Sequence, residues 1–114
     1  MTADKRLSRR LSARITANCS VNREPSPLPS YFLSVTKDIS PKGARIVSSG
    51  EIKAGECLGV GLELPTSFIP LLAYCEVVWA KKEGSLSEAG IKFLKIDVPD
   101  AQKLTEFFQF SCEP

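Results

Sequence analysis

The chain has 114 residues, of which 43% are hydrophobic and 25% charged, and these values are typical of a single soluble globular domain. No apolar run approaches the ~18 residues of a membrane span, and no secretory signal opens the sequence, so we expect a cytoplasmic protein. The chain contains no histidine, which removes the commonest general base and metal ligand and argues against a hydrolase or a transferase.

The positive charge is concentrated at the N-terminus. The net charge of the whole chain is +2. Within the first 14 residues the charged side chains are Asp4, Lys5, Arg6, Arg9, Arg10 and Arg14. Such a segment attracts anions, with phosphates as the leading candidates and an anionic membrane or nucleic acid as alternatives, although a solvated tail would have the same composition. We predict a flexible basic arm over residues 1–13 and one domain over residues 14–114.

The first half of this domain is expected to contain strands. The run "RITANCSV" alternates, which predicts a half-buried strand with one apolar face. That face consists of Ile15, Ala17, Cys19 and Val21. The proline-rich run "NREPSPLPS" is a loop, and "YFLSVTK" is a second strand with Tyr31, Leu33 and Val35 on one face.

A turn follows in "SVTKDISPKGARI". Asp38 can cap its own backbone, Pro41 fixes φ, and Gly43 can adopt a positive φ, so a chain reversal accounts for this stretch. Further strands are predicted at "ARIVSS", "CLGVGLEL", "LLAYCEVVWAKK" and "EAGIKFLKI". Short strands at this spacing favour a small sandwich or barrel, because closure protects the strand edges.

The last element is an amphipathic helix over about residues 98–110. Its apolar residues recur at helical spacing and are Val98, Ala101, Leu104, Phe107 and Phe108. We expect the helix to pack on one opening of the barrel, and a helix that faces a partner or a membrane is the alternative.

The cysteines do not suggest a metal site. Cys19, Cys57, Cys75 and Cys112 are widely spaced and contain no C-x-x-C pair. The first three lie in strand-like runs, where a reduced thiol behaves as a small apolar side chain.

Two motifs could form a binding site. Arg10-x-x-x-Arg14 ends where the first strand begins, and Asp38-x-Ser40-x-x-Gly43 lies at the turn. Arg6 and Arg10 satisfy the first spacing as well. Each motif alone is a weak signal, but the two in this order are more specific.

Together the motifs resemble those of the PilZ domain family, the bacterial receptors for cyclic-di-GMP, and the resemblance extends from Arg9 to about residue 110. It implies a mostly β fold, a six-stranded antiparallel barrel with a C-terminal helix, that binds a ligand and performs no catalysis. Arg9 resembles the pattern of members that hold two stacked ligand molecules. We also expect a monomer whose basic arm folds over the barrel when ligand phosphates neutralise its charge, and which thereby regulates an unidentified protein partner. The resemblance implies that the regulated process is motility, exopolysaccharide synthesis or a related one.

The chemistry of the motif residues fits such a ligand. An arginine fork matches phosphate oxygens and the N7 and O6 edge of guanine, so Arg9, Arg10 and Arg14 are candidate ligand contacts. The Asp38 carboxylate complements the donor edge of guanine, and the Ser40 hydroxyl can bond to a phosphate or a base. Gly43 has a steric role, because a side chain there would prevent the turn or crowd the ligand.

Arg45 and Trp79 are further candidates. Arg45 follows Gly43 by two residues and is expected at the surface, within possible reach of the phosphates. Trp79 could stack on guanine, but it alternates with Val77 along one strand, which favours packing in the core or at the barrel rim.

Two other functions remain open from the sequence. The domain could be a PilZ-like module that binds a protein and no nucleotide. A small barrel that binds single-stranded nucleic acid would have the basic arm, but the chain lacks a row of exposed aromatic residues among basic ones. We therefore expect no nucleic acid polymer and no membrane span among its partners.

Overall fold

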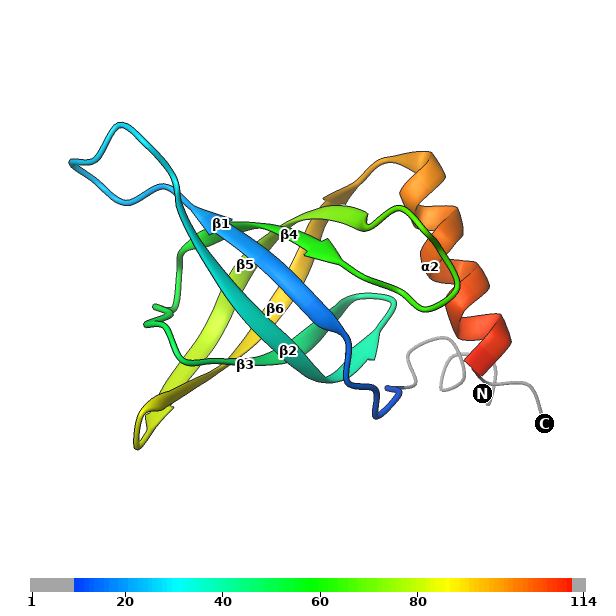
Figure 1. The fold of residues 1–114 in the computed structure, drawn as a ribbon, viewed down its shortest axis with the longest axis horizontal. Helices are drawn as coiled ribbons and strands as arrows, with labels where there is room; N and C mark the ends of the chain where they lie inside the picture. Colours follow the sequence, from blue (N-terminus) through cyan, green and yellow to red (C-terminus); the bar gives the residue numbers. More distant parts are fainter. Residues whose placement is uncertain (1–9, 112–114) are drawn as a thin grey trace.

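The computed structural model describes residues 10–111, and within this range six strands close into an antiparallel barrel with one helix at its end (Figure 1). The elements are β1 (Thr16–Val21), β2 (Ser30–Ser40), β3 (Gly43–Ser48), β4 (Cys57–Leu62), β5 (Leu71–Glu83), β6 (Leu86–Ile96) and α2 (Val98–Ser111). The strand order around the barrel is β1-β2-β3-β6-β5-β4, and β4 pairs with β1 to close it. The predicted fold class is therefore confirmed.

The inside of the barrel is mainly apolar. The predicted inward face of β1 is confirmed, because all four of its apolar side chains are buried. The largest side chains with almost no exposed surface are Ile39, Ile46, Leu58, Leu62, Leu71 and Val77. Burial of each such side chain contributes about 1.5–3 kcal/mol, so these residues hold the strands together.

In strand β2 several apolar side chains face solvent and polar ones face the core, the reverse of the usual arrangement. Tyr31, Leu33 and Val35 share a face as predicted, but that face points outward, and the exposed fractions of the three side chains are 77%, 61% and 39%. The inward positions include Ser34 and Thr36, which are buried. Both hydroxyls donate to backbone carbonyl oxygens of β1 or of the segment before it. Ser34 Oγ donates to the carbonyl oxygen of Ala17 at 3.1 Å, and Thr36 Oγ1 donates to that of Ala13 at 2.5 Å. These bonds satisfy polar groups inside the barrel and leave an apolar stripe outside.

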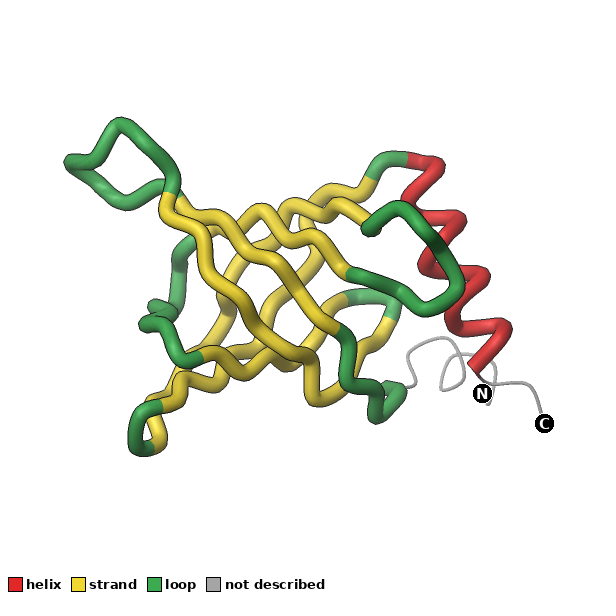
Figure 2. The backbone as a smooth tube through the Cα atoms, viewed as in Figure 1, coloured by secondary structure: helices red, strands yellow, loops and turns green. Residues whose placement is uncertain are grey.

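Helix α2 lies at one end of the barrel, and the loop between β1 and β2 projects from the other end (Figure 2). The N–H of Ala101 donates to the carbonyl oxygen of Asp97 at 2.8 Å, which fixes the first turn. Leu104 and Phe107 face the barrel and are buried, whereas Val98 is exposed. Helix α2, the only helix in the described range, does not combine the length and the apolar character that a membrane-spanning helix needs.

Two of the cysteines belong to the core. Cys19 and Cys75 are buried, and burial raises the pKa of the Cys75 thiol to about 12, so it stays protonated and behaves as an apolar group. Cys57 is exposed, in contrast, and Cys112 lies outside the described residues. No cluster of potential metal ligands occurs among residues 10–111.

Candidate functional site

The segment before β1 is bonded to the end of β2. The N–H of Leu11 donates to the carbonyl oxygen of Ile39 at 2.8 Å, and the N–H of Ile39 donates back to that of Leu11 at 2.9 Å. Leu11 and Ala13 also pack against the core. Of the flexible arm expected over residues 1–13, residues 1–9 lie outside the described range, and residues 10–13 lie on β2. This attachment places Arg10 beside Asp38.

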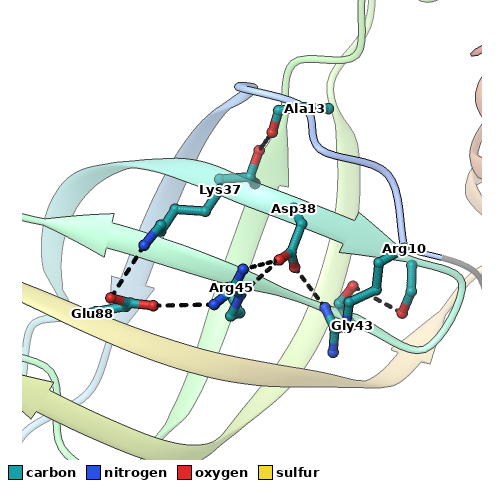
Figure 3. Close-up of polar contacts among 9 residues, drawn as sticks. Arg10, Ala13, Lys37, Asp38, Gly43, Arg45 and Glu88 are labelled. Carbon is teal, nitrogen blue, oxygen red and sulfur yellow. Dashed lines mark hydrogen bonds and ion pairs between the residues drawn. The ribbon is translucent and has the colours of Figure 1, made fainter.

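The Asp38 carboxylate lies between two arginines (Figure 3). Arg10 Nη1 donates to Oδ1 at 2.7 Å, and Arg45 Nε donates to Oδ2 at 2.6 Å. Burial acts to raise the pKa of Asp38, but the hydrogen bonds from Arg45 and Arg10, together with their charges, outweigh burial and hold the pKa below its ordinary value. Asp38 is therefore ionised, and each of its oxygens already has a cationic partner.

The charged cluster continues to Glu88 on β6. Arg45 Nη1 lies 3.7 Å from Glu88 Oε2, and Lys37 Nζ lies 3.5 Å from Glu88 Oε1. Glu88 is only 7% exposed, so its charge needs these partners. The cluster thus alternates in sign from Lys37 through Glu88, Arg45 and Asp38 to Arg10, with three cations and two carboxylates.

Sequence reasoning missed Lys37 and Glu88. A β-bulge between Thr36 and Asp38 lets the consecutive side chains of Lys37 and Asp38 both reach the cluster, as Figure 3 shows. Glu88 meets them through the pairing of β3 with β6, across more than 40 residues of sequence. Neither residue belongs to a motif, and only the strand register brings them together.

Ser40 organises the turn at the end of β2. Ser40 is buried. Its hydroxyl accepts a hydrogen bond from the N–H of Lys42 at 3.2 Å and donates one to the carbonyl oxygen of Gly43 at 3.4 Å. The side chain that we expected to point toward a ligand therefore has its partners within the turn.

Gly43 is required for a different reason from the one predicted. The expectation of a positive φ at Gly43 is wrong, because the glycines with positive φ in the described range are Gly55 (92°) and Gly84 (62°). A Cβ on Gly43 would lie 2.1 Å from the carbonyl oxygen of Ile91. The glycine therefore permits the close approach of β3 and β6, which places Arg45 opposite Gly90.

Trp79 faces outward. The alternation with Val77 predicted an inward side chain, but a β-bulge between the two residues breaks that alternation. Val77 is 1% exposed and Trp79 is 38% exposed, so of the two predicted placements for Trp79, the core or the barrel rim, the core is wrong. The indole lies over Gly90, since a Cβ there would be 2.2 Å from Trp79 Nε1.

The strand register places Trp79 in one row with the charged cluster. Asp38 pairs with Arg45, Arg45 pairs with Gly90, and Gly90 pairs with Trp79. The row crosses β2, β3, β6 and β5 on the outer face of the barrel. Arg10 and Arg45 keep half-exposed side chains there, so the row offers cationic groups and an aromatic ring to an anion that carries flat rings.

The remaining candidates lie before the barrel. Arg14 is exposed just ahead of β1, on the segment that Leu11 attaches to β2. Arg6 and Arg9 lie outside the described residues. The structure thus brings together Arg10, Asp38 and Arg45, with Trp79 in the same row.

The ion pairs of Asp38 predict a pH dependence of stability. The folded-state pKa of Asp38 is lowered, so its ion pairs stabilise the fold fully above the unfolded pKa of about 3.9 and this contribution is lost as the pH falls through the folded pKa. We expect Asp38→Asn to unfold at a lower temperature than the wild type at pH 7, and the difference to shrink below about pH 4. Thermal unfolding at several pH values measures this, and a difference that persists in acid would show that the ion pairs do not stabilise the fold.

The chain matches a known protein family in sequence and several solved structures in fold. A sequence model described as the PilZ domain matches residues 4–110. No curated protein sequence matches the chain significantly.

Solved structures with this fold include three informative neighbours. The inhibitor of motility MotI/DgrA of Bacillus subtilis superposes with a TM-score of 0.69 at 16% identity, covering 92% of this chain and 51% of its own. The PilZ domain with c-di-GMP of YcgR from Escherichia coli superposes with a TM-score of 0.65 at 12% identity, and the match covers 91% of this chain and 88% of that domain. The PilZ domain of CeSA from a cellulose-synthesizing bacterium superposes with a TM-score of 0.62 at 11% identity, and the match covers 93% of this chain and 100% of that domain. This chain spans about half of the Bacillus protein, and at these identities the likeness shows the fold.

Proposed function

The chain belongs to the PilZ family, and on that premise we propose that it is a receptor for cyclic-di-GMP. The observation that carries the proposal is the row in which Arg10, Asp38, Arg45 and Trp79 share one outer face of the barrel. In the E. coli neighbour, a PilZ domain is recorded with this same dinucleotide. Binding without catalysis is the proposed activity.

The chemistry of the row suits this ligand. Cyclic-di-GMP carries two phosphates and two guanine bases, so it needs cationic donors and flat surfaces. Arg10 and Arg45 supply donors, and the indole of Trp79 supplies a stacking surface. Because both oxygens of Asp38 hold arginines, we propose that this carboxylate orients Arg10 and Arg45 before it meets a guanine edge.

The arm supplies the other proposed contacts. Arg14 follows Arg10 by four residues, so both guanidinium groups can turn toward one compact dianion. We propose that Arg9 joins them and that two stacked ligand molecules occupy the site, with Arg6 as a further candidate. Ser40 and Gly43 would support the site through the turn and through the β3–β6 contact.

Ligand binding is proposed to change the arm. Arg10 is held by Asp38 in this structure, so phosphates would compete with the carboxylate for the same guanidinium. The resulting rearrangement of the arm would alter the surface that a protein partner meets. One of the structural neighbours is an inhibitor of motility, and control of motility or of exopolysaccharide synthesis is the proposed setting.

The single tryptophan gives a direct experiment. The chain contains one Trp, so intrinsic tryptophan fluorescence reports on Trp79 alone. We expect micromolar cyclic-di-GMP to quench this emission saturably, because a guanine stacked on the indole changes its surroundings. GTP at the same concentration is the control for absorption of the exciting light. Emission that responds no more to the dinucleotide than to GTP would contradict the proposed place of Trp79.

A further inference from the structure

A groove lies on a different face of the barrel from the charged row. It has a volume of about 820 Å³ and extends over β2, β1, β4 and β5, which are neighbours in that order, and its lining also includes Lys95 of β6 and Asp97. Its walls are formed by Tyr31 and Leu33 of β2 and by Leu72 and Tyr74 of β5. All four wall side chains are at least half exposed. Residues of the proposed ligand site do not line it.

The strand register explains how the groove forms. Leu33 and Leu72 lie at the two ends of one row, with Asn18 and Gly61 between them. In the next row Tyr31 and Tyr74 are separated in the same way by Ser20 and Gly59. Each row therefore has large side chains at its ends and small residues in its middle, which hollows the surface along β1 and β4.

The walls are unusual for a strand surface. On β2 the polar residues Ser34 and Thr36 point into the barrel while Tyr31 and Leu33 point to solvent. A strand on the surface of a soluble domain ordinarily has the reverse arrangement. Clustered exposed apolar side chains rimmed by polar residues mark interaction surfaces.

The dimensions of the groove favour a helix as its occupant. The walls on β2 and β5 are three interstrand spacings apart, or roughly 14 Å along the barrel surface, and an α-helix with its side chains is about 10–12 Å wide. The barrel is closed, so β1 and β4 present no free edge to which an extended peptide could add as a strand. An extended peptide on this face would leave most of its backbone hydrogen bonds to water.

The available area argues against a second copy of the chain. The four wall side chains offer on the order of 500 Å² of exposed surface, judged from the size of aromatic residues. A stable protein interface buries about 800 Å² on each partner. A single helix that fills the groove does not need such an area, because binding of this kind relies on a few apolar anchors.

We propose that this groove binds one amphipathic helix of a partner protein. Apolar residues at positions i, i+3, i+4 and i+7 of that helix would contact Tyr31, Leu33, Leu72 and Tyr74, and its polar face would remain in solvent. Strands β2 and β5 contribute to both the groove and the charged row, but the inference rests on the groove alone and goes beyond cyclic-di-GMP binding.

A library of helical peptides displayed on phage, with the apolar face randomised, tests the proposal. The intact chain is the bait, Leu33→Glu places a charge in one wall, and Ser20→Trp fills the floor. Leu86→Glu is the matched control, since Leu86 is an exposed strand residue outside the groove. We expect the wild type to select peptides with apolar residues at helical spacing, and both groove variants to weaken their binding about 10-fold or more, as loss of one buried leucine does.

Several results would overturn the proposal. These are a failure to select any helical consensus, selection of peptides with alternating apolar residues, or equal binding to the wild type and the two groove variants. Sedimentation that shows a dimer of the wild type, dissociated by Leu33→Glu but not by Leu86→Glu, would assign the groove to a second copy instead.

Discussion

Arg14→Ala is expected to weaken binding of cyclic-di-GMP by about 100-fold or more, because each hydrogen bond to a charged group contributes about 1.5–3 kcal/mol and an arginine fork makes two of them. Arg14 is exposed ahead of β1 and lies outside the core, so the thermal stability of the variant should equal that of the wild type. Calorimetric titration with the dinucleotide measures the loss directly.

Two further variants sharpen this experiment. Arg14→Lys keeps the charge and removes the fork, so we expect an affinity between those of the wild type and Arg14→Ala. Lys82→Ala removes an exposed cation near the tip of the β5–β6 hairpin and should bind normally. Equal affinities of Arg14→Ala and the wild type would show that the arginine motif is not part of the site.

Gly43→Ala is expected to destabilise the fold by about 3 kcal/mol, as severe overpacking does. The added methyl group would lie 2.1 Å from the carbonyl oxygen of Ile91, which is backbone and cannot rotate away. Strands β3 and β6 would have to separate, and the pairing of Arg45 with Gly90 would move with them. Denaturant unfolding measures the change in the free energy of unfolding.

Gly50→Ala is the matched control for Gly43→Ala. A Cβ on Gly50 would meet its nearest atom, Ser48 Oγ, at 3.6 Å, which is ordinary contact. We therefore expect its free energy of unfolding to stay within about 0.5 kcal/mol of the wild type. If the two variants were equally stable, the close approach of β3 and β6 would not be what requires glycine at position 43.

The sequence was sufficient to predict the elements that depend on local pattern. The alternation in β1 gave the correct inward face, and the helical spacing of Leu104 and Phe107 gave the correct buried side of α2. The spacing of the short strands left a small sandwich or a barrel open, and the resemblance to the PilZ family implied the six-stranded barrel that the structure shows.

The predictions that failed concern features that depend on the register of strand pairing. The bulges at Thr36/Asp38 and Val77/Trp79 shift which residues face outward, and each is set by pairing with another strand. The alternation of Trp79 with Val77 therefore suggested an inward face that Trp79 does not have, and Lys37 was missed. Gly43 was correctly singled out, but its neighbour Ile91 lies on a strand far away in sequence, so local turn chemistry suggested the wrong reason.

Binding of cyclic-di-GMP to the intact chain tests the central claim most directly. Isothermal titration calorimetry of the folded wild type should give a saturable signal with a micromolar or lower Kd, and Asp38→Ala should weaken it strongly because Arg10 and Arg45 lose the carboxylate that orients them. No binding at micromolar ligand, by protein whose circular dichroism shows a folded barrel, would contradict the account and favour a PilZ module that binds only a protein.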